Sequence, residues 1–117
     1  MERRLRLRHG ADFRRVRVHG RHHSGRLLRM LVAAGNCAHN RYGVVAGKGL
    51  GNAVKRNRAR RLLREALRAL HPHLRPGHDL VLVARPAMVG VSMSSLRAAL
   101  ARQMRRAGLL LQEGDAG

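Results

Sequence analysis

The sequence predicts an α+β fold in which helices pack on a small mixed β-sheet. The 18 residues of Ala53–Leu70 repeat apolar side chains at helical spacing. Residues 79–84 (DLVLVA) form a continuous apolar run, which is typical of a strand buried on both faces. With 117 residues the chain has room for one domain around a single modest core, so residues 1–117 are expected to form one domain.

The first elements are expected to be a helix and two strands. Residues 1–10 are basic and irregular, and are expected to lie against the body or to stay flexible until a partner binds. Residues 11–18 place Phe13 and Val16 at helical spacing, and Gly20 can end that helix. Residues 20–25 are expected to form a loop. Residues 26–34 and 41–46 predict two neighbouring antiparallel strands.

A glycine-rich loop (47–51) leads into the central helix, which Asn52 can cap and which His71-Pro72 should end. On a helical wheel the apolar stripe consists of Ala59, Leu62, Leu63, Ala66 and Leu70. The opposite face carries Asn57, Arg60, Arg61, Arg64 and Arg68, with Arg56 and Arg58 on its flanks. Pro76-Gly77 then forms a turn before the apolar strand.

A last helix is predicted after Ser92 or Ser94, either of which can cap it. Its apolar stripe is Leu96, Ala99, Leu100, Met104 and Ala107. Its outward face is basic: Arg97, Arg102, Arg105 and Arg106. Gly108 should end this helix, and residues 108–117 are expected to be flexible.

The charge of the chain favours a nucleic-acid partner. There are 25 Lys and Arg against six Asp and Glu, a formal net charge of +19, and seven of the basic residues stand on the central helix. An anionic membrane surface is a weaker alternative, because such helices usually carry bulky aromatics and this one has none. A single cysteine and the lack of a long apolar run predict a cytoplasmic protein without a membrane span or disulfide.

Two nucleotide-binding motifs can be rejected by spacing. Gly43 lies one residue too close to Gly47-Lys48 for a P-loop, and Asn52 stands where the dinucleotide fingerprint needs its third glycine. The backbone amides of this loop, beside a helix N-terminus, could still hold a phosphate oxygen. In an RNA-binding protein that oxygen would belong to a backbone phosphate.

The acidic residues do not predict a protein-based nuclease. The six carboxylates are scattered over separate elements, so no metal site and no catalytic side chain are expected, and Glu65 and Asp79 are expected to pair with arginines. Pairs such as His22-His23 could serve in metal-free RNA cleavage, although loop histidines are more often simply solvated. A helix-turn-helix DNA reader is disfavoured because a strand and a glycine loop precede the basic helix. A ribosomal-type or general structured-RNA-binding protein fits the composition equally well.

Residues 51–64 (GNAVKRNRARRLLR) closely resemble the signature of the protein subunit of bacterial ribonuclease P, an Arg-Asn-Arg core preceded by Gly-x-Ala-Val. The similarity extends to Asp12-Phe13 with Val16 and His19-Gly20, and to residues 79–86 (DLVLVARP). It implies a fold like the second domain of ribosomal protein S5, with a left-handed βαβ crossover around the basic helix. It also implies an accessory role in an endoribonuclease that matures the 5′ end of precursor tRNA, in which the RNA subunit catalyses with Mg²⁺.

The resemblance implies two sets of RNA-binding residues. Those expected to contact the ribonuclease P RNA are Lys48, Asn52, Lys55, Arg56, Asn57, Arg58, Arg60, Arg61, Arg64 and Arg68. Those expected to hold the single-stranded 5′ leader of precursor tRNA, in a cleft between the first helix and the sheet, are Phe13, Arg14, Arg17 and Met30. No obligate protein partner is indicated.

The leader cleft departs from the family pattern in its lack of aromatic residues. Members commonly line it with several aromatics on which bases can stack, but Phe13 and Tyr42 are the only aromatics in this chain. Arg17 and Met30 stand at positions that are often aromatic. Leader binding is therefore expected to be more electrostatic and more sensitive to salt.

Overall fold

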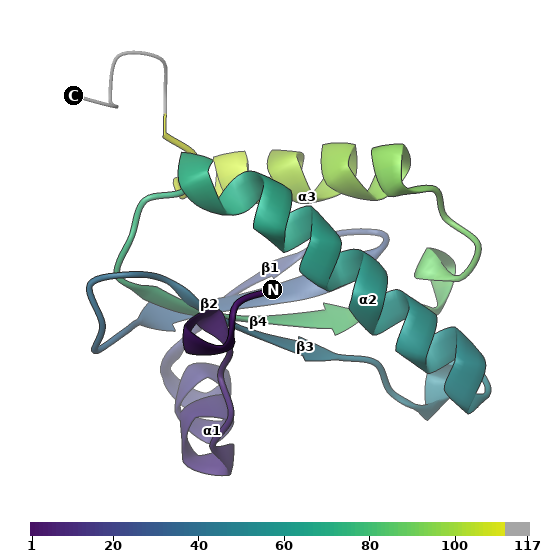
Figure 1. Ribbon diagram of the computed structural model, residues 1–117, viewed down its shortest axis with the longest axis horizontal. Helices are drawn as coiled ribbons and strands as arrows, with labels where there is room; N and C mark the ends of the chain where they lie inside the picture. Colours follow the sequence, from purple (N-terminus) through teal and green to yellow (C-terminus); the bar gives the residue numbers. More distant parts are fainter. Residues whose placement is uncertain (112–117) are drawn as a thin grey trace.

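The computed structural model describes residues 1–111 as three α-helices and a four-stranded sheet (Figure 1). The helices are α1 (Gly10–His19), α2 (Ala53–Leu70) and α3 (Met93–Arg106). The strands are β1 (Arg21–Ser24), β2 (Leu28–Ala34), β3 (Arg41–Val45) and β4 (His78–Ala84). Helices α2 and α3 cover one face of the sheet, and α1 lies on the other face. This arrangement confirms the predicted α+β class and mixed sheet.

The strand order β1-β2-β4-β3 corrects one prediction. Strands β2 and β3 run in opposite directions as expected, but they are not neighbours, because β4 lies between them. β4 pairs antiparallel with β2 and parallel with β3. The central place suits β4, whose side chains are buried or half-buried along its whole length. The β3–α2–β4 connection is thus a βαβ crossover between adjacent parallel strands.

The segment expected to be a loop, residues 20–25, contains strand β1 at the edge of the sheet. β1 pairs antiparallel with β2, from Arg21 opposite Val32 to Ser24 opposite Arg29. Its sequence, RHHS, is mostly exposed and has no apolar alternation, so hydrophobic patterning could not reveal it. Gly20 ends α1 as predicted, and its lack of a side chain is required: a Cβ there would lie 2.2 Å from the Val16 carbonyl oxygen.

The main core lies between the sheet and the pair α2 and α3. From α2 it takes Ala59, Leu63 and Ala66, which were predicted, and Leu67, which was not; Leu62 and Leu70 are half-buried against it. From α3 the predicted Leu96, Leu100 and Met104 are fully buried. The predicted caps are confirmed, since the side chains of Asn52 and Ser92 accept hydrogen bonds from the first turns of α2 and α3.

A second, smaller core joins α1 to the opposite face of the sheet. It consists of Leu7, Val16, Leu31 and Val81, with Phe13 packed at its margin. Leu5 and Leu7 are both buried, so the first ten residues lie against the body, the first of the two alternatives expected for them. Leu109 is buried and Leu110 pairs with Leu74, so residues 108–111 also pack; the rest of the predicted flexible tail lies outside the described residues.

Candidate RNA-binding faces

Helix α2 presents the basic face that its sequence predicts. Lys55, Asn57, Arg58, Arg61 and Arg68 are exposed, whereas Arg56, Arg60 and Arg64 are half-buried along its flanks. Asn52 is exposed but already caps the helix, with its Oδ1 accepting the Lys55 amide at 3.0 Å. Lys48 is exposed in the short 3-10 helix Lys48–Leu50 just before the cap. The predicted contact residues therefore lie along one helix and its approach.

The N-terminal segment adds an arginine to this face. A groove of about 300 Å³ between that segment and α2 is lined by Met1, Arg6, Arg61, Arg64, Glu65 and Arg68. Partial burial, together with the positive charges of Arg6 and Arg60, holds the pKa of Arg64 below its ordinary value. Arg6 could not be assigned to this site from sequence, because only the fold brings residues 1–10 beside α2. Glu65 makes no ion pair within residues 1–111, contrary to its predicted pairing with an arginine.

Two arginines of α2 differ in how their donors are used. Arg60 donates to the side-chain oxygen of Asn57 and, at 3.5 Å, to the carbonyl of Ala46. The Nε–H of Arg56 is buried and has no hydrogen-bond partner within residues 1–111. A buried donor without a partner is costly to the fold.

On the other face of the sheet, Phe13 of α1 lies directly over β3. A Cβ built on Gly43 would sit 2.5 Å from the ring of Phe13, so the ring occupies space that only a glycine leaves free. Arg14 and Arg17 on the same helix are exposed, and Val45 at the end of β3 remains 37% exposed. Three of the four predicted leader-binding residues thus lie on α1, and their binding of the leader stays a prediction.

The fourth, Met30, was assigned wrongly. Its side chain is fully buried in the core under α2 and α3, on the sheet face opposite α1. Successive residues of a strand point to opposite faces, so the β2 residue directed at α1 is its neighbour Leu31. Tyr42 faces the same core as Met30, where its hydroxyl lies 2.6 Å from Nδ1 of His71 and burial raises its pKa to about 12. Phe13 is therefore the only aromatic on the α1 face.

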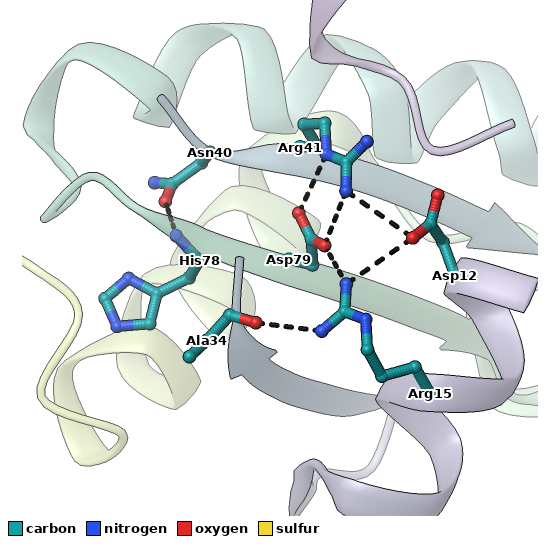
Figure 2. Close-up of polar contacts among 7 residues, drawn as sticks. All are labelled: Asp12, Arg15, Ala34, Asn40, Arg41, His78 and Asp79. Carbon is teal, nitrogen blue, oxygen red and sulfur yellow. Dashed lines mark hydrogen bonds and ion pairs between the residues drawn. The ribbon is translucent and has the colours of Figure 1, made fainter. Parts of the chain in front are cut away.

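A buried carboxylate fixes α1 to the sheet (Figure 2). Asp79 of β4 is 1% exposed and accepts from Nε and Nη2 of Arg41 at 3.0 and 2.9 Å. It also pairs with Arg15 of α1, whose other nitrogen donates to the Ala34 carbonyl at 2.8 Å. Asp12 lies 3.6 Å from both guanidinium groups. The hydrogen bond to Asp79 raises the pKa of Arg41. The predicted pairing of Asp79 with arginines is confirmed.

The described part of the chain contains neither a metal-binding cluster nor a membrane-spanning helix. Residues 1–111 contain no group of three or more His, Cys, Asp or Glu side chains placed to hold a metal ion. Within the same residues, no helix is long and apolar enough to cross a membrane. The strongest features of these residues are thus arginine-rich surfaces.

Comparisons with known proteins identify the family of the chain. The family model described as Ribonuclease P matches residues 1–108. The chain belongs to the ribonuclease P protein family. It is 46% identical over 111 residues to the ribonuclease P protein component of Chloroflexus aggregans, covering 94% of this chain and 82% of that protein. It is 41% identical over 118 residues to that of a Roseiflexus species, covering 100% and 96%.

Solved structures extend the likeness to the fold. A mutant of the Staphylococcus aureus ribonuclease P protein with defective mRNA degradation activity superposes with a TM-score of 0.86 at 27% identity, covering 94% of this chain and 93% of that one. The Thermotoga maritima ribonuclease P protein gives a TM-score of 0.79 at 25% identity, covering 86% and 96%. As a ribonuclease P protein component, the chain associates with ribonuclease P RNA and functions in tRNA 5′ maturation.

Proposed function

We propose that the chain is an accessory subunit whose α2 face binds the catalytic RNA of ribonuclease P, while that RNA performs the cleavage. The observation that carries this is the row of arginines on α2. Arg58, Arg61 and Arg68 are exposed without an ion pair within residues 1–111, and the buried Nε–H of Arg56 has no acceptor. Guanidinium groups in such a row match backbone phosphates, which would supply the missing negative charge.

The substrate of the complex is precursor tRNA, and we place its single-stranded 5′ leader on the α1 face. Phe13 offers one ring for base stacking, and Arg14 and Arg17 offer charge and guanidinium planes. Met30 is not part of this proposal, because it is buried on the other side of the sheet. With a single aromatic, most of the leader affinity must come from the arginines.

The chemical step is assigned to the RNA subunit with Mg²⁺. Hydrolysis of a phosphodiester by two metal ions needs carboxylates gathered around those ions, and the four acidic residues within 1–111 are Glu2, Asp12, Glu65 and Asp79. Asp12 and Asp79 are engaged with Arg15 and Arg41, and Glu2 pairs with Arg4. Mg²⁺ is therefore proposed to bind through the RNA. The complex is expected to work in the cytoplasm, where bacterial tRNA precursors are made.

Reconstitution tests this function directly. Purified protein would be mixed with a bacterial ribonuclease P RNA, and leader removal from precursor tRNA would be followed at low Mg²⁺, where RNA alone is slow. We expect protein-dependent cleavage that disappears when the RNA is omitted. Tight RNA binding without stimulation would indicate a ribosomal or general RNA-binding role instead, and cleavage by the protein alone would contradict the assignment of chemistry to the RNA.

The α2 face is tested by replacing Arg60, Arg61 and Arg64 together with Ala. These side chains lie off the buried stripe and alanine favours helix, so the circular dichroism spectrum should not change, while affinity for the RNA subunit should fall. A matched variant replaces three exposed arginines elsewhere, Arg21, Arg97 and Arg105. Equal losses of affinity in the two variants would mean that net charge alone, and not the α2 face, determines binding.

A further inference from the structure

A third arginine-lined surface lies between α3 and the turn that joins β1 to β2. It is not part of either face described above. A groove of about 350 Å³ separates α3 from the turn between β1 and β2. Arg26 stands on the turn, and Arg102 and Arg106 stand one helical turn apart on α3. The small side chains of Ala98 and Ala99 leave the space between these arginines open.

The walls of this groove are held in place by hydrogen bonds from two side chains. Gln103 of α3 is 5% exposed, and its amide nitrogen donates to the carbonyls of His23 and Leu28, at 3.0 and 3.2 Å. From the other side, Arg85 donates to the Gly25 carbonyl at 2.9 Å. A Cβ on Gly25 would lie 2.7 Å from the Gln103 side chain, so a larger residue there would displace the Gln103 amide. The turn that carries Arg26 is therefore fixed relative to α3, which lowers the ordering cost of binding a ligand there.

The charge of the groove is uncompensated. None of its lining residues is acidic, and neither Arg26, Arg102 nor Arg106 makes an ion pair or a hydrogen bond through its side chain within residues 1–111. Like charges on one wall repel each other unless an anion lies between them. No large exposed apolar side chain lines the groove, which disfavours insertion into a membrane. Its exposed guanidinium groups, without counterions within residues 1–111, suit the phosphate groups of a nucleic-acid backbone.

The groove is also distinct from the α2 face. Helix α2 packs over β3 and β4, whereas α3 is bonded through Gln103 to β1 and β2, at the other edge of the sheet. Edge strands of a four-stranded sheet lie about 14 Å apart, since adjacent strands are separated by ~4.8 Å. Figure 1 shows α2 and α3 side by side above the sheet. None of the residues that line the groove belongs to α2, so RNA bound along α2 does not engage these residues.

We propose that the groove of Arg26, Arg102 and Arg106 binds backbone phosphates of a second RNA segment, distinct from the one bound by α2. The proposal rests on the proposed function in that it takes RNA as the partner. It makes the protein a two-sided binder that holds separate stretches of the same complex together. Affinity for a large structured RNA then depends on both sides, whereas a short RNA can occupy only one of them.

The experiment compares two double variants of one helix. Arg102→Ala with Arg106→Ala removes two charges from the groove, and Arg97→Ala with Arg105→Ala removes two exposed charges of α3 outside it. Binding of each protein to a bacterial ribonuclease P RNA would be titrated at several salt concentrations. We expect the groove variant to bind more weakly than the wild type. The magnitude of its slope of log affinity against log salt should be smaller by about 1.5, because each of the two lost phosphate contacts contributes ~0.7–0.9 to that slope. Equal affinities and equal salt slopes of the two variants would refute the proposal that the groove binds RNA.

Position 98 provides an independent test that keeps every arginine. Ala98→Glu places a negative charge on the floor of the groove, one turn before Arg102, and Ala98→Gln fills the same space without the charge. Both residues are good helix formers at an exposed position, so circular dichroism should confirm the fold of each. Ala98→Glu should weaken RNA binding more than Ala98→Gln does. If Gln is as harmful as Glu, or if neither has an effect, phosphate binding in the groove is excluded.

The titration and the cleavage assay separate the two proposals. Wild-type protein that binds RNA through the groove but gives no stimulation of cleavage would overturn the proposed function and support the groove. Stimulated cleavage with identical binding by the groove variant and its control would support the function and overturn the groove. A wild-type protein that fails to bind the RNA would overturn both.

Discussion

Gly43 shows how a residue without a side chain positions a functional one. Phe13 was found from its helical spacing in residues 11–18, but the need for glycine beneath it arises only when α1 is laid across β3. The same limit explains the error at Met30. The residues 26–34 were recognised as a strand, yet an apolar run does not say which alternate residues face α1, because Met30 and Leu31 are equally apolar.

Replacing Gly43 with Ala should displace the ring of Phe13. The added Cβ would lie 2.5 Å from the ring, closer than carbon atoms can approach, and overpacking of this kind costs about 1–3 kcal/mol. We expect lower stability in urea denaturation and weaker binding of leader-bearing precursor tRNA. Gly47→Ala is the matched control, since nothing lies within 4 Å of its Cβ position. The loss should shrink in a Phe13→Ala background; an undiminished loss there would show that the ring is not what the new methyl group strikes.

Asp79 is the residue on which the attachment of α1 depends most. Asp79→Asn keeps the shape but removes the charge that Arg15 and Arg41 share, leaving two guanidinium groups without their buried counterion. Breaking a buried pair in this way should lower the free energy of unfolding by about 3 kcal/mol. Asp12→Asn, at a more exposed member of the same cluster, should cost less than about 1 kcal/mol. Chemical denaturation of both variants would test this, and equal costs would show that Asp79 does not dominate the cluster.

Among the elements, the helices were predictable and the sheet order was not. Apolar residues at helical spacing, the Asn52 cap and the His71-Pro72 stop placed α2 at its observed bounds. Strand β1 was missed because a short polar edge strand owes its existence to backbone pairing with β2 and not to its own side chains. The position of β4 between β2 and β3 likewise depends on tertiary packing, which the sequence patterns of the separate strands do not reveal.

The end of α2 carries a titratable group whose charge state affects stability. Burial, followed by the charges of Arg4 and His39, holds the pKa of His71 below its ordinary value, while Glu2 acts in the opposite sense. The neutral ring suits the fold, since its Nδ1 lies 2.6 Å from the Tyr42 hydroxyl, which can donate to it. Between the lowered folded pKa and the unfolded pKa of about 6.5, the unfolded chain binds the extra proton. Stability is therefore greatest above the unfolded pKa and is lost as the pH falls through this interval.

This predicts a difference between two histidine variants. The free energy of unfolding of the wild-type protein should decline as the pH falls below the unfolded pKa of about 6.5, and His71→Gln should make that decline shallower. His73→Gln, at an exposed position two residues on, should retain the wild-type slope. Denaturant unfolding at a series of pH values measures all three proteins. If His71→Gln declines as steeply as the wild type, the lost stability comes from other groups.

At the scale of the whole molecule, the net charge of +19 opposes the fold that carries it. Arginine surfaces on α2, on α1 and beside α3 surround a compact body with a Cα radius of gyration of 13.5 Å, about 1.7 Debye lengths at 0.15 M salt. At that salt the arginines repel mainly within each surface, and repulsion between the surfaces grows only as the salt is lowered. The family to which the chain belongs could be identified from residues 51–64 because that motif is local. The distribution of charge over three surfaces could not be predicted from the sequence, because only the fold brings Arg6 beside α2 and Arg26 beside α3.

Salt should therefore move folding and RNA binding in opposite directions. Raising KCl from about 0.02 M to about 0.2 M shortens the Debye length from roughly 20 Å to 7 Å, which relieves repulsion and should raise the Tm of the free protein. The same change should weaken leader-dependent affinity for precursor tRNA steeply, because a face with Phe13 as its single aromatic binds mainly through Arg14 and Arg17. Sucrose is the uncharged control: it should raise the Tm by exclusion from the surface without weakening RNA binding. Thermal melts and binding titrations over one salt series measure both effects. If the contribution of the leader to binding affinity stays constant across the salt series, stacking on Phe13, and not charge, holds the leader. If the Tm falls as salt is raised, attractive ion pairs such as those of Asp79 outweigh the repulsion among the arginines.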